Sequence, residues 1–116
     1  MKRLLVIDDD VEISKRLVTL LEDRYEVTRA TTGFEALEAL EHGPFDLVLL
    51  DLRMPGLDGR GFLSEMRRRN AKAPVVVLSA DPNVAKVAKE MGVDDYRQKP
   101  FDVDELEALI ERRIGV

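Results

Sequence analysis

The chain alternates five times between a short apolar run and a longer segment whose apolar residues recur at helical spacing. Alternation of this kind predicts a parallel β-sheet whose strands are joined by right-handed helical crossovers. The third and fourth runs are continuously apolar, which is typical of central strands that helices cover on both faces. The expected strands are residues 3–7, 25–29, 46–50, 74–78 and 94–97.

Each segment between the strands carries a single apolar stripe, which predicts a helix packed against one face of the sheet. Two helix starts have capping-box spacing, Thr32 with Glu35 and Asp102 with Glu105. A third start is expected at Asp81, directly before a proline. The sequence therefore predicts a three-layer α/β/α fold with a doubly wound parallel sheet.

Length and composition narrow the class of protein further. A chain of 116 residues without a Pro/Gly/Ser-rich linker is expected to form one domain, residues 1–116, with no output domain. The absence of cysteine excludes disulfides and favours a reducing cytoplasm, and no run is long enough to cross a bilayer. The net charge of -5 argues against direct nucleic-acid binding and leaves proteins and small charged ligands as partners.

Polar residues gather where the predicted strands end. In an open parallel sheet, ligands bind outside the carboxyl ends of the strands. Because converging carboxylates repel one another, we expect a hard divalent cation among them, and Mg²⁺ prefers such oxygen ligands. The residues in question are Asp8 and Asp9 after the first strand, Asp51 after the third, Ser79 after the fourth and Lys99 after the fifth.

This set of side chains suits phosphoryl transfer, which requires neutralisation of charge on three equatorial oxygens. Mg²⁺ accounts for one oxygen, the Lys99 ammonium for a second, and the Ser79 hydroxyl with backbone N–H groups for the third. Asp51 is then the expected nucleophile, because a carboxylate can carry an aspartyl phosphate.

Four segments of the sequence resemble the receiver domain of two-component response regulators. The resemblance covers essentially the whole chain, with every signature position filled in order. The segments are Val6-Ile7-Asp8-Asp9-Asp10, Leu50-Asp51-Leu52-Arg53-Met54-Pro55-Gly56-Leu57-Asp58-Gly59, Val77-Leu78-Ser79-Ala80 and Tyr96-Arg97-Gln98-Lys99-Pro100-Phe101.

The resemblance implies a flavodoxin-like (βα)5 fold with strand order 2-1-3-4-5. It also implies that a histidine kinase or histidine phosphotransfer protein phosphorylates Asp51, in a reaction that depends on Mg²⁺. The ion would be held by Asp8, Asp9, Asp51 and the backbone carbonyl of Arg53. Such a protein is a signalling switch, and it catalyses only its own phosphorylation and dephosphorylation.

The resemblance further implies how the signal is passed on. Ser79 and Tyr96 would form the switch pair, and the bond between Lys99 and Pro100 would be cis. The fourth and fifth helices with the fifth strand would contact a downstream protein, and a homodimer on phosphorylation is left open. The stretch from Ser79 to Lys99 is a residue or two shorter than usual in the family, which leaves the length of the fourth helix open.

Two alternative interpretations remain at this point. Asp8 and Asp10 supply the two acids of a D-x-D motif, as in Mg²⁺-dependent phosphatases of the haloacid dehalogenase kind, but Glu12 stands where Thr or Val belongs. The other alternative keeps the receiver fold and makes the chain the N-terminal piece of a longer DNA-binding regulator. A nucleotide-binding fold is disfavoured, because neither G-x-G-x-x-G nor a P-loop follows any strand.

Overall fold

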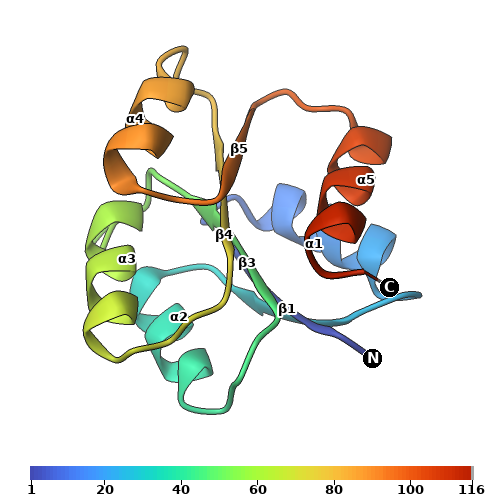
Figure 1. Ribbon diagram of the computed structural model, residues 1–116, viewed down its shortest axis with the longest axis horizontal. Helices are drawn as coiled ribbons and strands as arrows, with labels where there is room; N and C mark the ends of the chain where they lie inside the picture. Colours follow the sequence, from blue (N-terminus) through green and yellow to red (C-terminus); the bar gives the residue numbers. More distant parts are fainter. Residues whose placement is uncertain (116) are drawn as a thin grey trace.

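In the computed structural model, which describes residues 1–115, five parallel strands form one sheet in the order β2-β1-β3-β4-β5 (Figure 1). This order and the α/β class confirm the predicted fold. The strands are β1 (Arg3–Ile7), β2 (Glu26–Ala30), β3 (Leu47–Asp51), β4 (Val75–Ser79) and β5 (Asp95–Gln98).

One helix follows each strand, and the helices form two layers. Helices α1 and α5 cover one face of the sheet, and α2, α3 and α4 cover the other (Figure 1). In the described residues, no helix has the length and apolar character needed to span a membrane. The helices are α1 (Val11–Leu21), α2 (Gly33–Leu40), α3 (Gly59–Arg68), α4 (Val84–Met91) and α5 (Val103–Ile114).

The central strands lie in the core, as their continuous apolar runs predicted. Every residue of β3 and β4 is buried. Their alternate side chains feed two separate apolar clusters, one under each helical layer. Burying a large aliphatic or aromatic side chain contributes roughly 1.5–3 kcal/mol to the stability of the fold. The packing of β3 and β4 therefore holds the polar residues at their ends in place.

Four strands end one residue later than the sequence predicted. Asp51 still pairs with Leu78, and Ser79 pairs with Gln98, so the sheet ladder runs past the last apolar residue of each run. Asp51 and Ser79 are therefore the final residues of β3 and β4 rather than the first residues of the loops. Only the first strand has the predicted bounds.

The helix starts follow their capping residues, with one correction. Asp10, Thr32, Asp58 and Asp102 are all N-caps whose side chains accept backbone N–H groups of the first turn. The expected start at Asp81 is wrong, because α4 begins three residues later, at Val84, with Asn83 as its N-cap.

The segment before α4 is a turn that Asp81 organises. Its Oδ1 atom accepts the N–H of Asn83 at 2.8 Å, which closes a turn around Pro82. The helix that follows has eight residues, which answers the question left by the short stretch between Ser79 and Lys99. The Lys99–Pro100 bond is cis, as the family resemblance implied, and Gly43–Pro44 is a second cis bond that the sequence analysis did not predict.

Candidate functional site

Three carboxylates meet at the carboxyl ends of the neighbouring strands β1 and β3. Asp8 directly follows β1, and Asp51 ends β3, the strand beside it. Oxygen atoms of Asp8, Asp9 and Asp51 all lie within 4.8 Å of one another. Asp8 is 1% exposed and Asp51 7% exposed, whereas Asp9 faces solvent. The predicted meeting of these acids is therefore present in the structure.

Lys99 supplies a positive charge to this acidic group from the loop after β5. Its Nζ atom donates to Asp8 Oδ2 at 2.8 Å and lies 3.9 Å from Asp51 Oδ2. The other Asp8 oxygen, Oδ1, accepts the N–H of Asp10 at 2.9 Å. Asp8 is thus held on both oxygens, while Asp51 has the longer and weaker contact with the ammonium.

Ser79, at the end of β4, and Arg53, in the loop after β3, lie near Asp51. Ser79 is buried at the end of β4, and its Oγ accepts the N–H of Asp81 at 3.1 Å. The N–H of Arg53 donates to Asp51 Oδ1 at 3.3 Å. Across the two loops, Arg53 Nη2 lies 3.5 Å from Asp81 Oδ2. The role of the Arg53 carbonyl as a metal ligand stays a prediction.

The family of the chain follows from comparison with known proteins. A family model described as the response regulator receiver domain matches residues 4–111. The chain belongs to this family. Its fold and its acidic strand ends are accordingly those of a receiver domain of two-component response regulators.

Individual relatives support this assignment over almost the whole receiver domain. The chain is 40% identical over 113 residues to the DNA-binding transcriptional regulator NtrC of Escherichia coli (strain K12). The aligned region covers 95% of this chain and 24% of that protein. It is 36% identical over 113 residues to the transcriptional regulatory protein PcoR of Escherichia coli, covering 95% of this chain and 50% of that protein. The chain therefore spans a quarter to a half of the length of these two relatives.

Solved structures agree with the fold. The receiver domain of the Francisella response regulator 1452 has a TM-score of 0.89 and 33% identity, covering 98% of this chain and 97% of that one. The response regulator TrrA of Thermotoga maritima, in complex with Mg²⁺ and BeF, has a TM-score of 0.84 and 35% identity, covering 97% of this chain and 98% of that one.

Burial perturbs the central carboxyl group of the receiver domain. The pKa of Asp51 is raised from 3.8 to about 7, chiefly because burial disfavours the charged form, while Lys99 acts against the shift. The nearby charge of Asp8 and a side-chain hydrogen bond with Asp9, which favours protonated Asp51, raise this pKa further, and the N–H of Arg53 lowers it. Asp51 therefore changes charge near neutral pH in the metal-free protein.

Two predicted residues lie outside the carboxylate group. Tyr96 stands on β5 with 38% of its surface exposed, so its ring does not lie among the acids. Asp10, which the phosphatase alternative requires as its second acid, caps α1 by accepting the N–H of Ile13 at 3.1 Å. The D-x-D interpretation is therefore not supported by the position of its second acid.

Sequence reasoning missed the part that Gly59 has in the site. A Cβ atom at Gly59 would lie 2.7 Å from the carbonyl oxygen of Asp51 and 2.8 Å from Cα of Leu52. The first turn of α3 therefore rests directly on the end of β3. The signal was present as a glycine directly after the capping residue Asp58, but spacing alone did not reveal what the glycine touches.

We expect Lys99→Met to lower the free energy of unfolding at pH 8 by about 1–3 kcal/mol, because it leaves buried carboxylates without their ammonium. Lys99 lowers the pKa of Asp51, so its loss raises that pKa above its present value. Native Asp51 then holds its proton more tightly than unfolded Asp51, and stability falls as the pH rises. Urea unfolding at pH 5 and pH 8 in a chelator checks this, and the deficit should be smaller at pH 5.

Lys72→Met is the matched control for this substitution, since Lys72 is an exposed lysine in the loop before β4. Its effect should stay within about 0.5 kcal/mol at both pH values, as for most surface substitutions. Equal losses for the two variants, or a Lys99→Met deficit that does not change with pH, would contradict the role given to the ammonium.

Proposed function

We propose that this receiver domain accepts a phosphoryl group on Asp51 from a histidine kinase or a histidine phosphotransfer protein. The observation that carries the proposal is the position of Asp51, buried at the end of a central strand beside Asp8 and the Lys99 ammonium. Burial of the ionised carboxylate costs free energy, which is why the pKa of Asp51 is raised. Ionisable groups perturbed in this way are typical of functional sites.

The chemistry assigns a role to each neighbouring group. An ionised oxygen of Asp51 attacks phosphorus, a P–O bond forms, and the bond from phosphorus to the imidazole nitrogen of the donor breaks with its electron pair. The Lys99 ammonium is close enough to pair with a phosphoryl oxygen on this carboxylate, and the Ser79 hydroxyl has a proton to donate to another. Asp51 must lose its proton to react, so phosphorylation is expected to be faster above pH 7 than below it.

The donor set also fits Mg²⁺. Three carboxylates with one ammonium leave a net negative charge, and all the candidate ligand atoms are the oxygens that Mg²⁺ prefers. Asp8, Asp9, Asp51 and the Arg53 carbonyl would hold the ion. When bound, it would neutralise charge on the carboxylates and on the incoming phosphoryl group. TrrA, a relative at 35% identity, was solved with Mg²⁺ and BeF, which supports this assignment.

The test is incubation of the protein with acetyl phosphate and Mg²⁺, followed by intact-mass measurement and peptide mapping. We expect one added phosphoryl group on the peptide that carries Asp51, and none when a chelator replaces Mg²⁺. An unmodified mass under conditions where calorimetry detects bound Mg²⁺ would overturn the proposed reaction. Modification on another peptide would overturn the assignment to Asp51.

The way in which the signal leaves the domain is the second part of the proposal. Ser79 and Tyr96 are proposed as the switch pair, and α4, β5 and α5 as the face that contacts a downstream protein. NtrC of Escherichia coli is a DNA-binding transcriptional regulator of which this chain covers 24%. We therefore keep both possibilities for the chain, a receiver acting alone over residues 1–116 and the N-terminal part of a longer regulator.

A further inference from the structure

Strand β5 directs some of its backbone N–H and C=O groups toward the free edge of the sheet. Strand β5 ends the sheet and has β4 on one side. In a parallel ladder, alternate residues direct both N–H and C=O toward the same neighbour. The N–H of Lys99 donates to the carbonyl of Ser79 at 2.7 Å, so Arg97 and Asp95, two and four residues earlier, also face β4. Tyr96 therefore turns its N–H and C=O toward the open edge.

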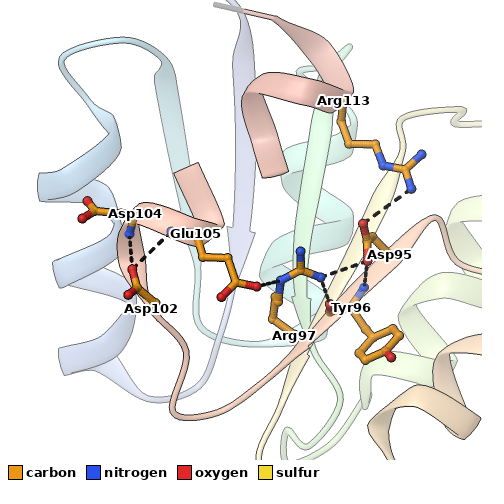
Figure 2. Close-up of polar contacts among 7 residues, drawn as sticks. All are labelled: Asp95, Tyr96, Arg97, Asp102, Asp104, Glu105 and Arg113. Atoms are coloured by element: carbon orange, nitrogen blue, oxygen red, sulfur yellow. Dashed lines mark hydrogen bonds and ion pairs between the residues drawn. The ribbon is translucent and has the colours of Figure 1, made fainter. Parts of the chain in front are cut away.

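Side chains of the same domain bind these edge-facing groups (Figure 2). The N–H of Tyr96 donates to Asp95 Oδ1 at 2.8 Å, and the carbonyl of Tyr96 accepts from Arg97 Nη1 at 2.6 Å. One residue before β5, the carbonyl of Asp94 accepts from Arg113 Nη2 at 2.5 Å. The N–H and C=O of Tyr96, which an added strand would need in the middle of this edge, are thus already bonded.

Ion pairs hold the capping side chains in place. Arg97 Nη1 lies 3.1 Å from Asp95 Oδ1, and Arg113 Nη2 lies 3.6 Å from Asp95 Oδ2. Arg97 Nε lies 2.9 Å from Glu105 Oε1, although without the angle of a hydrogen bond. We call these four residues, Asp95, Arg97, Glu105 and Arg113, the edge clasp. They tie β5 to α5, with Arg97 between the two carboxylates (Figure 2).

Without these bonds, the edge of β5 in one copy of the chain could pair with the same edge in a second copy. In an antiparallel pair, two opposed residues exchange both of their N–H···O bonds when both direct their backbone groups outward, as Tyr96 does. Two copies of β5 can therefore pair about a two-fold axis with Tyr96 opposite Tyr96 of the second copy. That register places Asp95 opposite Arg97 of the other copy, and opposite charges across two strands are favourable. The interface is isologous and closes as a dimer.

We propose that the edge clasp is an autoinhibitory contact, which prevents β5 from pairing with β5 of a second copy of this chain. An exposed edge strand is a template for strand pairing, and native proteins suppress this with charged side chains at the edge. Here the suppressing charges bond the edge backbone itself. The proposal is independent of the proposed phosphorylation, because it uses neither Asp51 nor a metal ion.

The experiment opens the clasp while keeping the residues that the two-fold pair would use. Glu105→Gln with Arg113→Gln removes the ion pairs that anchor Arg97 and Asp95 to α5 and the bond to the Asp94 carbonyl. Asp95 and Arg97 remain, and without these anchors they are expected to exchange the Tyr96 backbone for the second copy. Both replaced side chains are well exposed, at 58% and 39%, so the fold is expected to tolerate the change. Size-exclusion chromatography with light scattering should show a concentration-dependent dimer for the double variant and a monomer for the parent chain.

A cysteine reporter identifies the edge that pairs, since the chain has no native cysteine. In the two-fold register, Tyr96→Cys places two thiols on opposed residues at a Cα separation within disulfide range. The disulfide-linked dimer of Tyr96→Cys should form about tenfold faster in the opened background than in the parent. This ratio corresponds to the free energy of one or two net hydrogen bonds. Lys72→Cys, at an exposed site outside β5, should show no such acceleration.

Charge reversal distinguishes the proposed pairing from other contacts. Adding Asp95→Lys to the opened variant places like charges opposite each other in the two-fold register and should return the protein to a monomer. A dimer that persists after this change would overturn the β5 pairing. An opened variant that stays monomeric, with an unchanged rate of cross-linking through Tyr96→Cys, would overturn the proposed autoinhibition.

Discussion

Asp51→Asn is expected to make the receiver domain more stable at pH 8 and to abolish its phosphorylation. Burial raises the pKa of Asp51 from 3.8 to about 7, so the native protein binds the Asp51 proton more tightly than the unfolded chain does. The free energy of unfolding therefore falls as the pH rises from about 4 to about 7, and stays low above that range. Asparagine removes the buried charge and with it this loss.

The gain in stability should be about 1–3 kcal/mol at pH 8, less than the full shift of the Asp51 pKa allows, because the amide leaves Lys99 with one carboxylate fewer. The measurement is urea unfolding of both proteins at pH 5 and pH 8 in a chelator. The difference should shrink at pH 5, where native wild-type Asp51 is protonated. Asp23→Asn, at an exposed turn, is the control and should change stability little at either pH.

The loss of phosphorylation follows from the nucleophile itself. An amide oxygen is a far weaker nucleophile than a carboxylate oxygen and cannot form the same acyl phosphate. With acetyl phosphate and Mg²⁺, the intact mass of Asp51→Asn should stay unchanged while the wild-type mass increases by one phosphoryl group. A variant that is phosphorylated at the wild-type rate would refute the site. A variant less stable than wild type at pH 8 would refute the account of the buried charge.

The fold was predictable because its signals are local. Continuous apolar runs and single helical stripes carry the strand-helix alternation, and the order of strands then brings Asp8 and Asp51 together whatever the side chains do. The ends of the elements were less predictable. Asp51 and Ser79 are polar, yet they keep their ladder pairing, because a strand ends where its backbone bonds end and not where its apolar residues end.

Features that depend on side-chain conformation lay beyond sequence reasoning. The sequence suggests that Lys99 reaches the acidic site, but it does not say that Asp8 takes the shorter contact or that burial outweighs Lys99 in setting the pKa of Asp51. The edge clasp is a second case. The sequence predicted a strand over residues 94–97, but the bonds of Asp95 and Arg97 to the Tyr96 backbone exist only because both side chains fold back along β5.

Gly59→Ala is expected to destabilise the domain by about 2–4 kcal/mol, the upper range for overpacking a site whose neighbours are backbone atoms. The added Cβ would lie 2.7 Å from the carbonyl oxygen of Asp51 and 2.8 Å from Cα of Leu52, so the start of α3 must move away from β3. That movement breaks the hydrogen bond from the N–H of Gly59 to the carbonyl of Leu52, now 3.1 Å. It also displaces the residue that carries the proposed phosphoryl group.

Gly61→Ala, two residues further along α3, is the matched control because it meets a different kind of neighbour. Its Cβ would approach Cδ1 of Leu57 at 2.7 Å, the movable end of a side chain, and alanine is a better helix former than glycine by about 0.5–1 kcal/mol. Thermal unfolding should therefore separate the two alanines, with Gly61→Ala within about 1 kcal/mol of wild type. Gly59→Ala should also slow phosphorylation by acetyl phosphate under conditions where it remains folded. Equal stabilities would show that α3 does not rest on the end of β3 as tightly as the contacts of Gly59 indicate.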